Sequence, residues 1–192
     1  MKITEFEIIR VPPTWVWLLI HTNTEHIGIG EPYHENHPES VIAEVNRLEQ
    51  FLIGQDLTQI EKLWKIMSES GSSYVGGPIY KMLGGITEKK IATIAEAVYS
   101  KLAIHCPLSI IALSAALQID ACTTNFLIQE HNEVNDSFEN NKIFIGKGYI
   151  NDPFILDLNG EIEVPDAPGL GIEINRSGLN EIMSKPWSNI RG

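Results

Sequence analysis

The sequence predicts a small α+β unit followed by an α/β segment. Three short stretches with strand character, separated by a Pro-Pro pair and a polar turn, precede two stretches with helical spacing. After Pro78, apolar runs alternate with helical patterns, which is typical of parallel strands covered on both faces. With 192 residues and a hydrophobic fraction of 43%, the chain is long enough to bury a sizeable core.

The first unit is expected to be an antiparallel meander with two helices. The strands alternate apolar and polar side chains or form short apolar runs, and they are predicted at residues 2–10, 15–21 and 26–31. The first helix should begin near Pro38, because proline suits an early helical position, and end at Gly54. The second helix is predicted from about Thr58 to Ser70, with its apolar residues on one face.

The second part should alternate helices with short strands. Thr87 is a candidate N-cap for a helix from Glu88 to Ser100, and a helix that is apolar almost all round is predicted from Leu108 to Ile119. The remaining elements follow from apolar runs and from glycine, proline and polar clusters. They are buried strands at 102–105 and 125–129, a loop at 131–141, strands at 153–157 and 162–164, a rigid loop at 165–171 and a helix at 179–183.

Two titratable residues end the two predicted buried strands, His105 the first and Glu130 the second. Because the carboxyl ends of parallel strands meet at one edge, we expect these side chains to lie close together. A histidine can move a proton near neutral pH, and a neighbouring carboxyl group can orient or protonate a substrate. The alternatives are a core histidine with locally satisfied hydrogen bonds and an ion pair at the rim without chemistry.

Composition argues against several classes of partner. A net charge of −11 disfavours binding to nucleic acid and to an anionic membrane surface, which both select basic patches. The longest early apolar run, Trp15 to Ile20, is too short to span a bilayer. Cys106 and Cys122 lack a metal or redox spacing, which predicts reduced cysteines in a cytoplasmic protein. His34 and His37 could form a surface metal site, but a plain loop is the favoured interpretation.

Several motifs spread along nearly the whole chain resemble the enolase superfamily. The first half is similar to the capping domain of that superfamily. As a whole, the chain most resembles the galactonate dehydratase branch of its mandelate racemase and muconate lactonizing group. The motifs are Pro-Pro-Thr-Trp at 12–15, Ile-Gly-Ile-Gly-Glu-Pro at 27–32, Tyr-Val-Gly-Gly-Pro at 74–78, Gly-Gly-Ile-Thr-Glu at 84–88, Ala-Ile-His-Cys-Pro-Leu at 103–108, Leu-Ile-Gln-Glu at 127–130 and Val-Pro-Asp-Ala-Pro-Gly-Leu-Gly-Ile at 164–172.

The resemblance implies Mg²⁺-assisted dehydration of a sugar acid of the aldonate type. In such a reaction a base removes the proton α to a carboxylate, the metal stabilises the enediolate, and hydroxide leaves from the β carbon. By resemblance, His105 is the base at the end of the seventh barrel strand and Glu130 the acid at the end of the eighth. Trp15, which ends the first motif, is a candidate substrate-binding residue.

The resemblance also implies a large internal deletion. Gly84-Gly85 fits two glycine turns that lie far apart in the family, and a complete (β/α)₈ barrel needs about 250 residues. The chain therefore resembles a capping domain followed by an incomplete barrel. The implied divisions are the capping domain at 1–79, a remnant of the C-terminal part of the barrel at 80–150 and a segment that returns to the capping domain at 151–192.

The segments that the deletion removes would carry the metal-binding carboxylates and the aspartate partner of the histidine. We therefore expect no Mg²⁺ site in this chain and an impaired dehydratase. Two alternatives stay open. One is a non-catalytic binding or assembly protein, and the other is an active dehydratase completed by homo-oligomerisation through exposed barrel strands. Whether the chain is an enzyme is not decided by its sequence.

Overall fold

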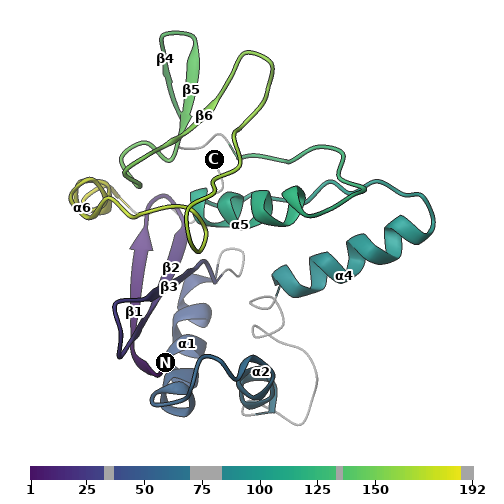
Figure 1. Cartoon of the computed structure of the whole chain (residues 1–192). Coiled ribbons are helices and arrows are strands. Elements are labelled where there is room, and N and C mark those ends of the chain that lie inside the picture. The colour runs from purple at the N-terminus through teal and green to yellow at the C-terminus, as the bar shows by residue number, and fades with distance from the viewer. Residues whose placement is uncertain (33–36, 70–83, 133–135, 187–192) are drawn as a thin grey trace. The chain divides into compact units, whose positions relative to one another are not determined.

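The computed structural model divides into two compact units, Met1–Gly84 and Gly85–Trp187, and each is described by itself (Figure 1). The structure describes residues 1–32, 37–69, 84–132 and 136–186. None of the helices in these ranges is long and apolar enough to cross a membrane. The predicted division at 1–79, 80–150 and 151–192 stays a prediction.

The first unit contains a three-stranded antiparallel sheet in the order β1-β2-β3. The pairing of β1 with β2 runs from Ile3 opposite Thr22 to Val11 opposite Trp15. The strands are β1 (Ile3–Val11), β2 (Trp15–Thr22) and β3 (Ile27–Gly30). The predicted antiparallel meander is therefore confirmed.

Two helices belong to this unit, α1 (Pro38–Leu52) and α2 (Ile60–Glu69), and α1 contacts β1, β2 and α2. Pro38 lies in the first turn of α1, as predicted. Four side chains form a core between these elements, namely Ile3, Leu48, Leu52 and Leu63, and none is more than 7% exposed. Burial of each such side chain contributes about 2 kcal/mol, so this core holds both helices on the sheet.

The second unit, which begins at Gly85, contains all but the first residue of α4 (Gly84–Ala97). The prediction that Thr87 caps a helix starting at Glu88 is wrong, because glycine tolerates helical dihedral angles and the helix already begins at Gly84. The helix also ends before the predicted Ser100. Its end coincides with a left-handed φ of 57° at Tyr99, which cannot continue a right-handed helix.

The other two helices, α5 (Ile110–Ala121) and α6 (Arg176–Met183), begin at side-chain caps. The Oγ of Ser109 accepts a hydrogen bond from the N–H of Ile111 at 3.3 Å, and the Oδ1 of Asn175 accepts one from the N–H of Gly178 at 3.0 Å. Such caps satisfy N–H groups that have no partner within the helix. They explain why α5 begins after the predicted position and α6 before it.

A second antiparallel sheet in the order β4-β5-β6 follows α5 in the chain. Its strands are β4 (Ser137–Glu139), β5 (Lys142–Ile145) and β6 (Phe154–Leu156). The prediction of a loop at 131–141 is thus wrong for β4. The missed signal is the pair Asn140 and Asn141, whose φ values of 50° and 61° match the two-residue turns that suit β-hairpins.

The predicted strand at 162–164 is absent from the structure. Asp157 instead closes a turn, since its carboxylate accepts the N–H groups of Asn159 at 2.8 Å and Glu161 at 2.9 Å. The hydrogen bond from Glu161, followed by that from Asn159, lowers the pKa of the Asp157 carboxyl. The structure describes no strand that pairs with residues 162–164, so their backbone takes no part in a β-sheet.

The two predicted parallel strands are reduced to a single parallel bridge between Leu102 and Phe126. The N–H of Leu102 donates to the carbonyl of Asn125, and the N–H of Leu127 donates to the carbonyl of Leu102, both at 2.8 Å. Leu127 and Ile128 are 62% and 63% exposed, and in the first segment Ile104 is buried whereas Ala103 is exposed, so the prediction of two buried strands is wrong for both. The physical reason is that no further strand in the described part of the chain lies beside them.

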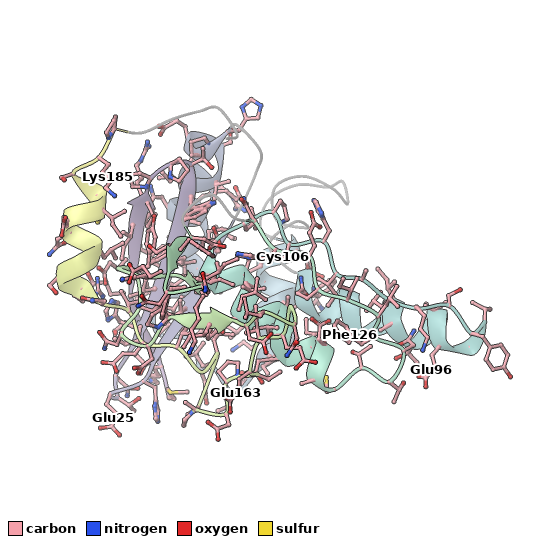
Figure 2. All side chains as sticks on the ribbon, turned by 90° about the horizontal axis from the view of Figure 1, so that it is seen from above. Glu25, Glu96, Cys106, Phe126, Glu163 and Lys185 are labelled. Carbon is pink, nitrogen blue, oxygen red and sulfur yellow. The ribbon has the colours of Figure 1, made fainter. Side chains whose placement is uncertain are left out.

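Asn125 links the second of these segments to the helix that precedes the first. Its side chain is buried, and its Nδ2 donates to the carbonyls of Ala92 in α4 at 3.1 Å and Ser100 at 2.9 Å. One buried carbonyl, that of Ala92, and one partly buried carbonyl, that of Ser100, therefore share one amide group as their donor. Figure 2 shows Cys106 and Phe126, one on each of the two segments.

Asn125→Ala is expected to lower the free energy of unfolding by about 2 kcal/mol, because it leaves two carbonyls without their donor. Urea unfolding followed by circular dichroism measures this change. The matched control is Thr124→Ala, which removes an exposed hydroxyl that donates to Glu96 at 2.6 Å and should cost less than about 0.5 kcal/mol. Equal effects of the two substitutions would contradict the structural role of Asn125.

Tyr149 is 4% exposed, and burial raises its pKa to about 12. In the unfolded chain a tyrosine ionises near pH 10, so the folded state loses stability as the pH rises from about 10 to 12. Between pH 9 and 11.5, the free energy of unfolding measured with urea should fall by about 2 kcal/mol more for the wild-type protein than for Tyr149→Phe. Tyr99→Phe, at a 97% exposed position, should behave like wild type. An unchanged pH dependence in Tyr149→Phe would refute the expectation.

Candidate functional site

His105 and Glu130 are brought together where the two paired segments end. The Nδ1–H of His105 donates a hydrogen bond to Oε2 of Glu130. The two side chains are 71% and 47% exposed, so a substrate can reach both from solvent. The proximity expected from the order of the segments is therefore present, whereas the interpretation of His105 as a core histidine is not supported.

Glu130 is held by a second donor in addition to the imidazole. Its Oε2 also accepts the backbone N–H of Cys106 at 3.2 Å. Because a carboxylate only accepts hydrogen bonds, the Nδ1 of His105 carries the proton of this contact, and Nε2 is the basic nitrogen of the neutral ring. The arrangement can take up a proton at Nε2 while the carboxylate orients the ring and stabilises the imidazolium that forms.

Two amide side chains beside Glu130 support this geometry. The Nε2 of Gln129 donates to the carbonyls of Ile104 at 3.1 Å and Glu130 at 2.7 Å. The Nδ2 of Asn132 donates to the carbonyl of Pro107 at 2.6 Å. Each amide ties the Glu130 segment to the His105 segment, so both act as positioning residues. The sequence analysis missed Gln129 and Asn132. The only feature of the sequence that could have indicated them is their position before and after Glu130, the candidate acid.

A magnesium ion needs near-octahedral oxygen ligation, commonly with one or two carboxylates. Among the described residues, no three His, Cys, Asp or Glu side chains lie close enough together to hold a metal ion. The carboxylate of Glu130, which lies beside His105, already accepts hydrogen bonds from His105 and from the backbone N–H of Cys106. The residues that the structure describes therefore do not fit Mg²⁺.

The other predicted site residues lie elsewhere. Trp15 belongs to the first unit, where it begins β2 and is 5% exposed, and its contact with a substrate stays a prediction. Of the alternative metal pair, His37 precedes α1, whereas His34 lies outside the described residues. His105 and Glu130 are thus the only predicted site residues that the described part of the second unit brings into contact.

Two curated relatives match part of the chain. A D-galactonate dehydratase from Verminephrobacter eiseniae is 35% identical in an alignment 116 residues long, and the alignment covers 48% of this chain and 30% of that protein. A D-galactonate dehydratase from Cronobacter sakazakii is 44% identical over 79 residues, which is 41% of this chain and 20% of that protein. The matched region thus spans less than a third of either dehydratase.

A solved structure shares the fold. The mandelate racemase/muconate lactonizing enzyme from Jannaschia sp. CCS1 superimposes with a TM-score of 0.73 at 12% identity, covering 97% of this chain and 98% of that chain. At this identity the likeness shows the fold alone. It agrees with the predicted fold class, an antiparallel capping unit followed by an incomplete barrel.

The sequence also matches a family model described as enolase C-terminal domain-like, over residues 29–178. This range is well over half of the chain and includes both His105 and Glu130. The resemblance read from the motifs is therefore confirmed. The chain belongs to the enolase C-terminal domain-like family.

Proposed function

We propose that this chain is a sugar-acid dehydratase of the galactonate type in ancestry, that it retains the proton-transfer pair, and that it is catalytically impaired as a single chain. The observation that carries the proposal is the hydrogen bond between Nδ1 of His105 and Oε2 of Glu130. The two D-galactonate dehydratases that match part of the chain support a sugar acid as the substrate class. Cys106 and Cys122 carry thiols rather than a disulfide, which supports a cytoplasmic location.

In this proposal the Nε2 of His105 accepts the proton on the carbon next to the substrate carboxylate. The electron pair of the broken C–H bond moves toward the carboxylate and forms an enediolate, and the hydroxyl on the next carbon leaves as hydroxide, which a proton converts to water. Glu130 accepts two hydrogen bonds as an ionised group, which favours an orienting role over that of a proton donor.

Impairment follows from the charge that develops in this reaction. The enediolate carries an additional negative charge, and such charge is stabilised chiefly by preorganised cations or dipoles. The nearest described carboxylate, Glu130, is itself an anion, so it opposes a second negative charge at the same edge. A histidine without such stabilisation is a poor base for a weakly acidic carbon-bound proton.

The purified chain is expected to show no dehydration of galactonate or mannonate with Mg²⁺ above a metal-free control. NMR in deuterated water should likewise show no exchange of the proton next to the carboxylate, which separates proton abstraction from loss of water. His105→Asn and the surface control His26→Asn should both equal wild type in these assays. Turnover in wild type that His105→Asn abolishes and His26→Asn preserves would overturn the proposed impairment.

The exposed edge favours a second candidate, an active dehydratase completed by association of several copies. Leu127 and Ile128 are largely exposed next to a single parallel bridge, and an unpaired edge of this kind can pair with another chain. Light scattering should then report a dimer or larger assembly that Ile128→Lys dissociates. Leu158→Lys, at an 85% exposed turn position, is the matched control and should leave the assembly intact. A monomer at all protein concentrations would exclude this candidate.

A further inference from the structure

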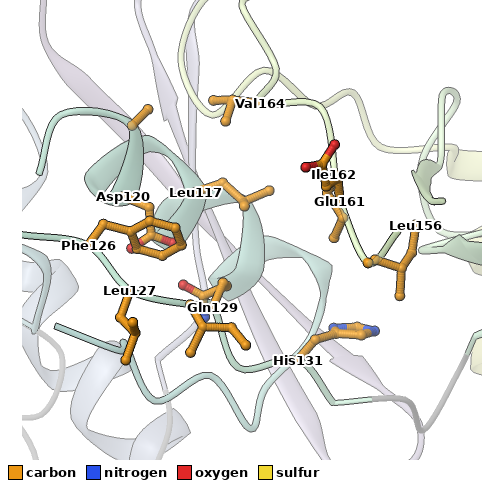
Figure 3. A pocket seen from close by; sticks show the side chains of 13 residues that line it. Leu117, Asp120, Phe126, Leu127, Gln129, His131, Leu156, Glu161, Ile162 and Val164 are labelled. Atoms are coloured by element: carbon orange, nitrogen blue, oxygen red, sulfur yellow. The ribbon is translucent and has the colours of Figure 1, made fainter. Parts of the chain in front are cut away.

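A cavity of about 650 Å³ lies within the second unit and is not lined by His105 or Glu130. Its walls come from α5, from the segment after the Leu102–Phe126 bridge and from the chain from Leu156 onward (Figure 3). Most lining residues are apolar, namely Leu117, Ala121, Phe126, Leu127, Ile128, Leu156, Ile162 and Val164. A concave, mainly apolar cavity of this size is the usual form of a small-molecule site.

The apolar side chains of the lining differ in their exposure. Leu117 on α5 is buried, whereas Phe126, Leu127, Ile128 and Val164 are exposed. The cavity is therefore open to solvent, and a ligand can reach its wall without unfolding the unit. A ligand that covers these side chains removes apolar surface from water, which is a favourable term in its binding.

Three polar residues of the lining do not offer their polar atoms to a ligand. Gln129 donates from Nε2 to two backbone carbonyls, and its Oε1 is buried. The Nε2 of His131 lies 2.8 Å from Oδ2 of Asp136, and the Nδ1 of the same ring is buried. Both carboxylate oxygens of Asp120 are buried as well. A ligand in the cavity therefore cannot form hydrogen bonds with these atoms.

The charge of the lining disfavours ionic ligands. Glu161 is an exposed acidic residue of the lining, and Asp120 is a buried one. The described lining contains no lysine or arginine. An anion would therefore meet like charge and no basic side chain. A cation would give up its hydration in a mainly apolar cavity, where the buried carboxylate oxygens of Asp120 cannot replace it.

We propose that this cavity binds a neutral, apolar small molecule built from two or three rings. A dry apolar cavity of about 150 Å³ holds one benzene molecule, so a cavity of about 650 Å³ has room for a larger ring system. The side chain of Phe126 offers such a ligand an aromatic surface to pack against. The proposal does not depend on the dehydratase ancestry, because neither His105 nor Glu130 takes part.

Fluorescence titration of the full chain into a fixed amount of dye tests the proposal at pH 7.5. The probe is N-phenyl-1-naphthylamine, a neutral three-ring molecule whose emission rises in apolar surroundings. The matched probe is its 8-sulfonate, which has the same rings and one negative charge. The neutral dye should bind about ten-fold tighter than the sulfonate, because the lining repels an anion and cannot replace its hydration. Equal affinities, or tighter binding of the sulfonate, would overturn the proposal.

Two competitors that differ by one hydroxyl group test whether polar atoms contribute to binding. Naphthalene should displace the neutral dye at least as well as 2-naphthol, because the polar atoms of Asp120, Gln129 and His131 are not available to the hydroxyl group. Displacement that is clearly stronger for 2-naphthol would contradict an apolar site. A second copy of the chain is the alternative occupant, and a dye affinity that falls as the protein concentration rises would show that it covers the cavity instead.

Substitutions at two exposed positions of the lining locate the site. Val164→Trp fills part of the cavity, and Leu127→Glu places a carboxylate in its wall, so each should weaken binding of the neutral dye about ten-fold. The matched controls are Ile155→Trp and Leu158→Glu, at exposed positions outside the lining, and they should leave the affinity unchanged. Circular dichroism checks that all four variants fold, as expected for exposed positions. Wild-type affinity in both lining variants would show that the dye does not occupy this cavity.

Discussion

Side-chain amides hold together the two extended segments on which the second unit is built. Backbone hydrogen bonds supply one parallel bridge, and the side chains of Asn125, Gln129, Glu130 and Asn132 supply further described ties from the second segment. In a complete parallel sheet, evenly spaced backbone hydrogen bonds would hold neighbouring strands together. Here the register that sets His105 beside Glu130 depends on Gln129 and Asn132, which donate to carbonyls of the His105 segment, while Asn125 donates to the carbonyls of Ala92 and Ser100, which precede that segment.

The first unit could be predicted closely from its sequence because its signals are local. Alternation defines β1, Pro38 marks the start of α1, and apolar residues at helical spacing form the face that meets Ile3. The meeting of His105 and Glu130 was also predictable, since it follows from the order of two segments along one edge. The local sequence left open whether His105 is a core histidine or part of a pair at the rim. The exposure of the His105 and Glu130 side chains favours the pair at the rim.

The remaining features depend on distant or missing neighbours and could not be read from local pattern. Leu127 and Ile128 have the sequence of a buried strand, yet burial requires adjacent strands that the described chain does not supply. The roles of Gln129 and Asn132 arise from carbonyls about 25 residues away. The turn at Asn140 and Asn141 is different, because its signal was local and simply went unrecognised.

The exposed apolar edge at Leu127 and Ile128 also bears on how copies of the chain behave in concentrated solution. At neutral pH a net charge of −11 sets up repulsion that acts over about a Debye length, farther than apolar contact reaches. Near the isoelectric point of about 4.9 this repulsion vanishes while the edge remains. The colloidal stability of the chain therefore depends on a balance between its acidic surface and exposed apolar side chains such as those of this edge, and mild acidity favours precipitation.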